Sequence, residues 1–511
     1  MLSNVFSSTV FGLDAYIVDV EIDISRGLPL FSLVGLPDTA VKESKDRVKS
    51  AIKNTGFKLS SNKIVINLAP ADIKKEGSAF DLPIAIGILT AEGIVDKKRA
   101  EDYVMVGELS LDGRIKEIKG ALSIAVSVKE SNIKGLILPV SNAKEAAVVS
   151  GIDVYGVETL PQVVEFINGN LPQLRPTDVE INTLFSENST YQDDFIEVKG
   201  QEHAKRALEI AASGAHNILM IGPPGSGKTM LSKRLCTILP PMNFEEAIET
   251  TKIHSIMGLL PQDSSLLIIR PFRSPHHTIS DAGLIGGGQI PKPGEVSLAN
   301  NGVLFLDELP EFKRNVLEVL RQPLEDGSVT ISRVTTSITY PSRFMMVSAM
   351  NPCNCGYFTD QTHECICTPM QIEKYRSRVS GPLLDRIDIH IDVPAVSFKD
   401  LHQDNNGEDS KTIRERVCRA RSIQEKRYRD EGIYCNSQLR PRQLKRHCNI
   451  DDECKRLIEM AMSKLGLSAR AYNKILKVSR TIADLDGRKD ILSQDISEAI
   501  QYRSLDRRIF V

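Results

Sequence analysis

Two segments of the sequence carry residues that bind phosphate and divalent cations. The first, ILMIGPPGSGKTML (218–231), reads as an apolar strand, a glycine-rich loop and a helix start, and fits G-x-x-x-x-G-K-[ST]. Glycines let backbone N–H groups turn inward around phosphate oxygens, and the following helix N-terminus adds partial positive charge. Lys228 is predicted to reach the β- and γ-phosphates of ATP, and the Thr229 hydroxyl to ligate Mg²⁺. The predicted nucleotide-binding residues are Gly222, Pro223, Pro224, Gly225, Ser226, Gly227, Lys228, Thr229 and Met230.

The second segment, GVLFLDE (302–308), is a buried-type strand that ends in two carboxylates. Acidic residues at the carboxyl end of a strand face the ligand crevice of an open α/β sheet. Asp307 is predicted to hold Mg²⁺ through its water shell, and Glu308 to orient and polarise the attacking water. The strand RFMMVSAMNP (343–352) ends on Asn351, which we expect between the two acids and the γ-phosphate. The alternative is an asparagine that favours the turn before Pro352.

Phosphoryl transfer is promoted mainly by electrostatics, so an arginine from outside the nucleotide loop is expected. The segment GPLLDRIDIHIDVP supplies Arg386, which we assign as a finger donated to a neighbouring subunit. Arg376 and Arg378 are competing candidates. Arg470 follows a plausible N-cap at Ser468, and it is expected to reach the γ-phosphate from a lid domain. The alternative for Arg470 is a solvated helix arginine. The predicted catalytic residues are Glu308, Asp307, Asn351, Arg386 and Arg470.

A cluster of cysteines lies directly after Asn351. Four of the nine cysteines follow the pattern C-x-C-x₉-C-x-C. Four thiolates make a closed tetrahedral structural site for Zn²⁺, although a C-x₂-C spacing is more usual. His363 is a spare ligand, and four reduced cysteines packed in a loop are the alternative. The predicted zinc ligands are Cys353, Cys355, Cys365 and Cys367.

Length and local patterns predict an α/β multidomain fold. The chain has 511 residues, more than the roughly 250–300 that one core accommodates. KIVINLAP (63–70) and GLILPV (135–140) are typical of strands, and a helical pattern ends near Gly56. We expect an α/β domain at 1–170, a polar linker at 171–190, a P-loop core with a parallel sheet at 191–398 and an α-helical lid at 399–511.

Composition indicates a cytoplasmic protein. No stretch approaches the roughly 20 apolar residues that span a bilayer, and no basic segment precedes the first apolar run. Net charge is −2, so no overall basic excess points to nucleic acid. That balance still allows a ring to place a few cations in its pore.

The segments RPFRSPHHTISDAGLIGGGQIPKPGEVSLANNGVLFLDELPEF (270–312) and SGPLLDRIDIHIDVP strongly resemble the magnesium-chelatase-like branch of AAA+ ATPases, and the whole chain resembles the YifB/ComM family. The resemblance implies a hexameric ring with ATP between subunits and a Lon-protease-like N-terminal domain. It also implies a helix-2 insert, placed at about 258–294, and a β-hairpin at 325–343. Pore candidates on these segments are Arg333, Arg273 and Lys292, and ordinary surface residues are the alternative for each.

The same resemblance implies a function on DNA. ComM-type proteins act in natural transformation as DNA helicases that extend heteroduplex by branch migration, so single-stranded or branched DNA is the expected partner. One alternative is a chelatase-type motor that remodels a protein or a tetrapyrrole-chelating partner, but the chain has no D-x-S-x-S signature. A non-hydrolysing scaffold is a second alternative, and the intact set of Lys228, Asp307, Glu308, Asn351 and Arg386 argues against it.

The Lon-like domain raises the question of a peptidase. The segment KKEGSAFDLP (74–83) resembles the Lon serine loop, with Ser78 as the nearest candidate nucleophile. The place expected for a catalytic lysine falls near 121–123, where no lysine stands, and Lys116 and Lys119 lie in a different register. A serine without a base is a weak nucleophile, so we predict no peptidase activity and a scaffold or DNA-contacting role.

Overall fold

The computed structural model describes residues 1–505 except 61, 76, 182–184, 186–190, 192, 262–263, 290, 334–336, 359, 361–362 and 397–406. The chain forms two compact units. The N-terminal unit comprises Met1–Asn188 together with Asn243–Ile268, and the C-terminal unit comprises Ser189–Met242 together with Ile269–Val511. The four-segment division expected from the sequence stays a prediction, and its last boundary lies outside the described residues. Among the described residues, every helix is too short or too polar to span a bilayer.

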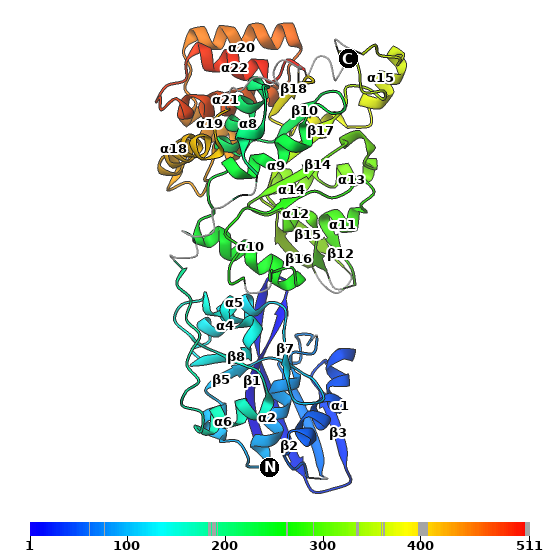
Figure 1. Ribbon diagram of the computed structural model, residues 1–511, viewed down its shortest axis with the longest axis vertical. Coiled ribbons are helices and arrows are strands. Elements are labelled where there is room, and N and C mark those ends of the chain that lie inside the picture. Colours follow the sequence, from blue (N-terminus) through cyan, green and yellow to red (C-terminus); the bar gives the residue numbers. More distant parts are fainter. Residues whose placement is uncertain are drawn as a thin grey trace. The chain divides into compact units, whose positions relative to one another are not determined.

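A mixed seven-stranded sheet organises the N-terminal unit, in the order β3-β4-β2-β1-β5-β8-β9 (Figure 1). Apolar and polar residues alternate along β2, so that one face of the strand is buried, which is the pattern of a sheet covered on one side. Two predicted strands are confirmed as β4 and β8. The strand bounds are β1 (Leu2–Phe11), β2 (Asp14–Ser25), β3 (Leu30–Val34), β4 (Lys63–Ala69), β5 (Tyr103–Met105), β8 (Gly135–Pro139) and β9 (Asp153–Val157).

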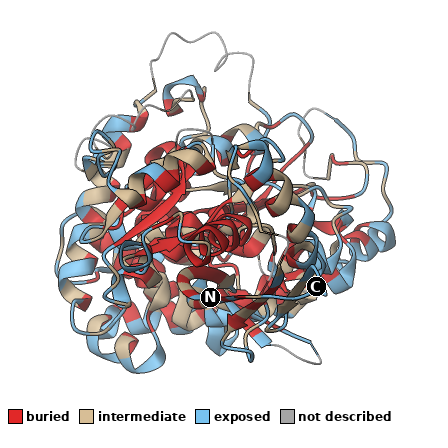
Figure 2. Ribbon diagram, turned by 90° about the horizontal axis from the view of Figure 1, so that it is seen from below, coloured by how far each residue is buried: buried red, intermediate tan, exposed pale blue. Residues whose placement is uncertain are grey.

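Several helices pack with this sheet in the N-terminal unit. Every residue of α2 (Asp81–Ala91) is buried, and the helix packs on β1 and β2. The predicted helix before Gly56 is confirmed as α1 (Thr39–Asn54), whose N-cap Asp38 accepts a hydrogen bond from the Val41 N–H. Buried residues, red in Figure 2, lie between sheet and helices. The remaining elements are α3 (Lys97–Ala100), β6 (Glu108–Leu109), β7 (Ile115–Lys116), α4 (Ala121–Glu130), α5 (Val140–Ala147) and α6 (Leu160–Asn168).

One helix of the N-terminal unit comes from the middle of the chain. Helix α10 (Phe244–Met257) packs on α4, and a capping box at Asn243 begins it. The Ser255 hydroxyl donates to the carboxylate of Glu145 and accepts a 2.9 Å hydrogen bond from the Gly120 N–H. Glu145 is buried, and burial raises the pKa of its carboxyl group. A buried polar network therefore anchors the end of α10.

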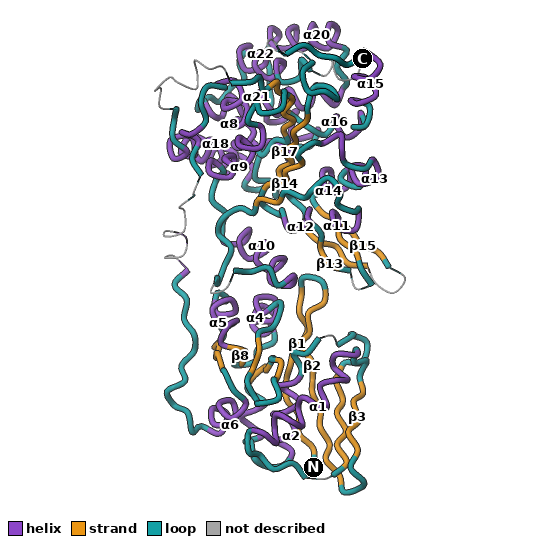
Figure 3. Tube along the Cα trace, turned by 45° about the vertical axis from the view of Figure 1, so that its right-hand side comes forward, coloured by secondary structure: helices purple, strands orange, loops and turns teal. Residues whose placement is uncertain are grey.

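A parallel five-stranded sheet forms the centre of the C-terminal unit, in the order β11-β14-β17-β10-β18. The three central strands are continuous buried apolar runs, as expected for a parallel sheet covered on both faces, and Figure 3 shows β14 and β17 among helices. Their carboxyl ends lie at one edge, because Ile221 pairs with Met350 and Leu306 with Ser348. The bounds are β10 (Ile218–Ile221), β11 (Phe272–Arg273), β14 (Val303–Leu306), β17 (Met345–Met350) and β18 (Ile389–Asp392).

Helices and short turns of helix flank this sheet. Helix α9 (Lys228–Ile238) follows the glycine-rich loop and starts at its lysine. The Glu308 backbone, with φ of 51°, leads from β14 into a short 3₁₀ turn. The other elements are α8 (Glu202–Gly214), η1 (Phe195–Glu197), η2 (Leu309–Glu311), α13 (Arg314–Glu318), α14 (Arg321–Asp326), α15 (Pro369–Arg376) and α16 (Gly381–Leu384).

Two hairpins project from the C-terminal unit side by side. The predicted hairpin is confirmed as β15 (Ser328–Ser332) and β16 (Ser337–Pro341). The expected insert is shorter than the predicted 258–294. It is the hairpin β12 (Gly286–Gly287) with β13 (Lys292–Pro293), which lies between α11 (Asp281–Ile285) and α12 (Glu295–Leu298).

The earlier part of the expected insert belongs to other structures. Residues up to Ile268 pack in the N-terminal unit, and β11 is an edge strand of the central sheet.

A side-chain hydrogen bond joins the two hairpins: the Tyr340 hydroxyl donates to the Pro291 carbonyl at 2.8 Å.

The end of the chain is helical, as the sequence predicts. Helix α18 contacts α8, α9 and α21, and several of its arginines bind acidic groups or carbonyls of the same unit: Arg427 pairs with buried Asp484, and Arg421 donates to the Ala212 carbonyl. These arginines therefore serve contacts within the unit. The bounds are α18 (Ser410–Tyr428), η3 (Asn436–Gln438), α19 (Pro441–His447), α20 (Asp452–Leu465), α21 (Ala469–Leu485) and α22 (Ser493–Gln501).

Candidate active site

The glycine-rich loop binds the Lys228 ammonium through two of its backbone carbonyls. Its Nζ donates 2.8 Å hydrogen bonds to the carbonyls of Gly222 and Pro223 and contacts Ser226 Oγ at 3.3 Å. Burial lowers the pKa of Lys228, and the nearby Asp307 carboxylate opposes that shift. Gly222 is required because a Cβ there would lie 2.0 Å from the Val393 carbonyl oxygen. Met230 packs against the core from the first turn of α9.

Thr229 and Asp307 meet across the loop. Thr229 Oγ1 donates a 2.8 Å hydrogen bond to Asp307 Oδ2, and Asp307 Oδ1 accepts from the Glu308 N–H at 2.9 Å. A hydroxyl and a carboxylate side by side supply the hard oxygen ligands that Mg²⁺ prefers. These residues fit a magnesium site in which Thr229 would ligate the ion and Asp307 would hold it through its water shell.

Asn351 follows the strand that lies between the acidic strand and the strand leading into the nucleotide loop. It follows β17, which separates β10 from β14 in the sheet. Its Oδ1 faces Lys228 Nζ at 3.4 Å. The structure therefore brings four predicted residues together: Lys228, Thr229, Asp307 and Asn351.

Glu308 stands beside this group and contacts a residue that sequence reasoning assigned no functional role. Its Oε2 lies 3.4 Å from His277 Nδ1, and the His277 ring packs edge-on against Phe312. Glu308 also has a positive φ, a conformation that costs a non-glycine residue energy and is found mostly at functional sites. The two adjacent histidines at 276–277 were a possible signal of function in the sequence, but only the fold shows that His277 contacts Glu308.

The arginine candidates make contacts within the unit. Arg386 binds Glu325 and the Pro382 carbonyl. Arg376 Nε donates to the Pro352 carbonyl at 3.0 Å and its guanidinium lies over the Phe358 ring. Arg378 donates to Glu311 at 2.8 Å. None of these contacts of the three arginines reaches Lys228, Thr229, Asp307 or Asn351, so a role in catalysis requires a nucleotide bound by another subunit.

Arg470 lies in the first turn of α21, where the sequence predicted it. Ser468 caps this helix by accepting from the Ala471 N–H. The Arg470 side chain is largely exposed, and its NH1 lies 3.7 Å from Asp385 Oδ2. Asp385 precedes Arg386, so the lid helix and the finger candidate meet at adjacent residues.

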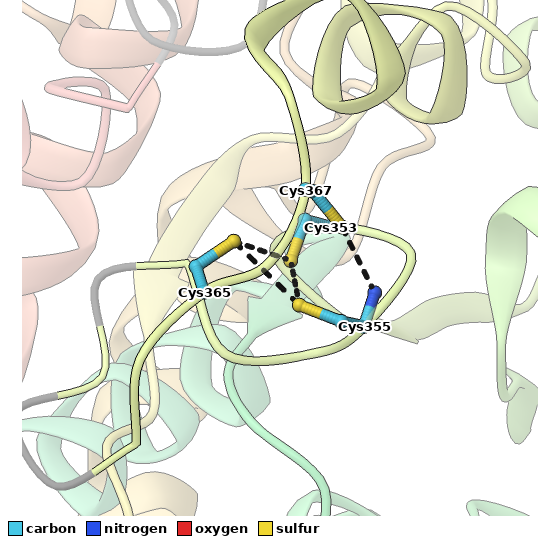
Figure 4. A group of neighbouring side chains, drawn as sticks. All are labelled: Cys353, Cys355, Cys365 and Cys367. Carbon is cyan, nitrogen blue, oxygen red and sulfur yellow. Dashed lines mark hydrogen bonds between the residues drawn. The ribbon is translucent and has the colours of Figure 1, made fainter.

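The four predicted cysteines converge (Figure 4). Cys353 Sγ lies 3.3 Å from Cys355 Sγ, and Cys365 Sγ lies 3.6 Å from both. Cys367 joins through a 3.4 Å hydrogen bond from the Cys355 N–H, and all four sulfurs lie within 4.8 Å of one another. Tetrahedral Zn–S bonds of about 2.3 Å place sulfurs about 3.8 Å apart, so the cluster fits Zn²⁺. The His363 side chain is largely exposed and stacks on Tyr357.

The cysteine loop rests against the nucleotide loop. Gly356, between the first and second cysteine pairs, has a φ of 90°, and a Cβ there would meet Pro224 Cδ at 2.6 Å. The same Cβ would lie 4.0 Å from Asn351 Cγ. A metal held by the cysteines would therefore support the position of both Pro224 and Asn351.

Gln201 is a further site residue that the sequence did not single out. Its Nε2 donates to the Ser226 carbonyl at 2.7 Å and to the Pro394 carbonyl at 3.0 Å. Its buried Oε1 has no hydrogen-bond partner among the described residues. Gln201 thus ties the nucleotide loop to the chain beyond β18 while presenting one free acceptor.

Comparison with known proteins decides the family. The model for magnesium chelatase, subunit ChlI, matches residues 194–401; a second model for subunit ChlI of Mg-chelatase matches 20–142, and one for its C-terminal part matches 407–503. The chain is 46% identical over 511 residues to competence protein ComM of Haemophilus influenzae. The aligned region covers 99% of this chain and 98% of that protein. The chain belongs to the ComM/YifB family of magnesium-chelatase-like proteins.

Other relatives place the family more widely. YifB of Escherichia coli is 43% identical over 509 residues, covering 99% of this chain and 98% of that protein. Lon protease 2 of Bacillus subtilis is 31% identical over 144 residues, covering 28% of this chain and 25% of that protease. The expected family and the α/β fold class are confirmed, and the likeness to Lon is partial.

Ser78, which stands where the resemblance to Lon places a nucleophile, hydrogen-bonds to an acidic side chain. Its hydroxyl donates to the Glu108 carboxylate, which lies 3.9 Å from Lys116 Nζ. Ser123 lies in the segment where the resemblance to Lon places a catalytic lysine, and its hydroxyl donates to the Leu13 carbonyl at 2.7 Å. Among the described residues, the Ser78 hydroxyl is thus bonded to Glu108 and to no lysine.

Proposed function

We propose that this chain is an Mg²⁺-dependent ATPase that assembles into a hexameric ring and drives branch migration on DNA during natural transformation. The observation that carries the ATPase is the meeting of Lys228, Thr229, Asp307 and Asn351 at the carboxyl ends of three parallel strands. In open α/β sheets this edge binds ligands. The full-length similarity to a competence protein supports the DNA part.

Each side chain has a task in hydrolysis. The Lys228 ammonium binds the β- and γ-phosphates in place of the loop carbonyls, and Thr229 and Asp307 hold the cation. When bound, Mg²⁺ neutralises charge that develops on the phosphate oxygens. Glu308 accepts a hydrogen bond from water, whose oxygen attacks the γ-phosphorus as the bond to the β–γ bridging oxygen breaks. Asn351 orients that water beside the γ-phosphate.

Glu308 must leave His277 to do this. The 3.4 Å approach of His277 Nδ1 to Glu308 Oε2 competes with water for the same carboxylate oxygen. The contact is partly exposed on both sides, and polar contacts that water reaches in this way are weak. Substrate binding therefore displaces it at low cost.

The two joined hairpins are the proposed DNA-contacting elements. Lys292 is exposed on β13, and Arg333 at the tip of β15 donates to the Gly288 carbonyl. Arg273 is the less favoured candidate, because Glu295 binds its guanidinium in a bidentate pair with distances of 2.6 and 2.7 Å. Cations on two adjacent hairpins suit a phosphate backbone.

Subunit mixing tests the ring. A Lys228→Ala subunit lacks its own phosphate site but supplies Arg386, whereas an Arg386→Ala subunit keeps its site and lacks the finger. Each variant alone is expected to be inactive, and doubly tagged mixed assemblies are expected to regain hydrolysis at the junctions that combine both intact residues. Purified mixed assemblies without activity would exclude Arg386 as a residue donated in trans.

A further inference from the structure

Within the C-terminal unit, Arg386 is held by its own chain. NH2 donates to Glu325 Oε1 and NH1 to the Pro382 carbonyl, and 10% of the side chain is exposed. The third donor, Nε, is buried without a hydrogen-bond partner among the described residues. A buried unpaired donor is costly, so this arrangement satisfies the guanidinium incompletely.

The backbone around Arg386 is fixed, so only the side chain is free to change position. The Arg386 carbonyl accepts from Asn217 Nδ2 at 3.3 Å, and the Ile387 carbonyl accepts from Lys474 Nζ at 2.9 Å. The buried carboxylate of Asp388 lies 3.5 Å from the same Lys474 ammonium. These contacts anchor the segment to β10 and to helix α21.

Glu325 stands at the base of the β15–β16 hairpin. It lies in the last turn of α14, and Gly327, with φ of 64°, joins that helix to β15. Its side chain is 54% exposed. A displacement of the hairpin would therefore move the carboxylate that holds Arg386. Because the Glu325 side of the pair is half-exposed, water can solvate its carboxylate as soon as the hairpin moves it away from Arg386.

We propose that Glu325 is a positioning residue that retains Arg386 within its own subunit until the hairpin moves, and then releases it toward the γ-phosphate of the neighbouring subunit. This inference rests on the proposed role of Arg386 as a finger. A phosphate offers the guanidinium a bidentate, charged acceptor and satisfies more of its donors than Glu325 does. Contact between DNA and the hairpin thereby permits ATP hydrolysis in the neighbouring subunit.

The test compares Glu325→Gln with Glu408→Gln in the full chain. Glu408 is a matched control because its carboxylate is 57% exposed and pairs with a different arginine, Arg416. Basal hydrolysis of ATP and its stimulation by forked DNA are measured. Phenylglyoxal modification of Arg386, quantified by mass spectrometry, reports directly on release of the guanidinium.

Glu325→Gln is expected to raise basal hydrolysis up to about fivefold, lower the stimulation by DNA in proportion and increase Arg386 modification. Glu408→Gln is expected to match the unmodified chain. The double variant Glu325→Gln with Arg386→Ala is expected to match Arg386→Ala alone, since Glu325 acts through that arginine.

Two results overturn the inference. One is a Glu325→Gln variant with unchanged basal rate and unchanged Arg386 modification. The other is a loss of hydrolysis without any change in modification, which indicates a merely structural residue. Failure of the proposed function looks different: Arg386→Ala would then hydrolyse ATP at the rate of the unmodified chain.

Discussion

The Thr229 hydroxyl donates a 2.8 Å hydrogen bond to the Asp307 carboxylate, from a position 78 residues earlier in the chain. This contact joins the glycine-rich loop to the acidic strand end and marks the proposed position of Mg²⁺. Neighbouring residues complete the site, with Lys228 on one side and Glu308 on the other.

Asp307→Asn is expected to weaken Mg²⁺ binding and lower hydrolysis about 10- to 100-fold, because the amide keeps the shape but loses the charge that holds the cation and its waters. A Mg²⁺ titration of hydrolysis measures both effects. The control is Asp452→Asn, an exposed acid paired with Lys455 in α20. An Asp307→Asn variant with an unchanged Mg²⁺ dependence would remove this residue from the cation site.

Gly356→Ala is expected to weaken ATP binding and slow hydrolysis, because the new Cβ would press on Pro224 at 2.6 Å. Gly432→Ala is the matched control: its φ is also positive, at 65°, but no atom lies within 4 Å of its Cβ. Nucleotide titration of both variants separates contact from backbone strain. Equal affinities would show that the cysteine loop does not support the nucleotide loop.

The cysteine cluster is expected to hold one Zn²⁺ per chain, as measured by elemental mass spectrometry on purified protein. Removing the metal with a chelator, or changing Cys365 to Ser, is expected to lower ATP turnover through the loop that carries Gly356 and Asn351. The control is Cys418→Ser, since this half-buried cysteine lies outside the cluster. Metal-free protein with normal turnover would contradict the supporting role.

Ser255→Ala is expected to lower the free energy of unfolding by about 1–3 kcal/mol, because Glu145 and the Gly120 N–H each lose a buried partner. Limited proteolysis is expected to cut within 243–268 first. Ser497→Ala removes an exposed hydroxyl that bonds only within its own helix, and it serves as the control. Unchanged stability and unchanged cleavage would show that this network does not anchor α10.

Ser78 is expected to resist serine-directed reagents, because its hydroxyl is bonded to Glu108 and to no lysine in the part of the chain that the structure describes. Labelling by a fluorophosphonate probe, with an active serine protease as the positive control, measures this directly. Covalent labelling at Ser78 would mean that the N-terminal unit retains a working nucleophile.

Local patterns predicted much of the site because its residues follow strands. Lys228, Asp307 and Asn351 each end or follow a continuous apolar run, and parallel strands bring such ends together. Contacts between distant segments were not predictable in this way. The approach of His277 to Glu308, the pairing of Glu325 with Arg386 and the docking of 243–268 in the N-terminal unit depend on tertiary packing.

The extent of the expected insert was wrong for the same reason. The segment 258–294 mixes short apolar stretches with glycine, proline and polar residues and has no strong period, so nothing local assigned its first part to another unit. The two residues of β11 are too short to read as a strand, yet they pair with β14. Only the hairpin that ends at Pro293 fits the expectation.

The most direct test of the central claim is hydrolysis of ATP by the purified full chain with and without forked or three-stranded DNA, with strand displacement scored in the same reactions. Glu308→Gln is the control, since the amide still fits the site but cannot polarise water as a carboxylate does. The account predicts that DNA stimulates hydrolysis and that branches move. The Glu308→Gln variant is expected neither to hydrolyse ATP nor to move branches. Hydrolysis that is indifferent to DNA, with no strand moved, would contradict the DNA motor and leave an ATPase that acts on another partner.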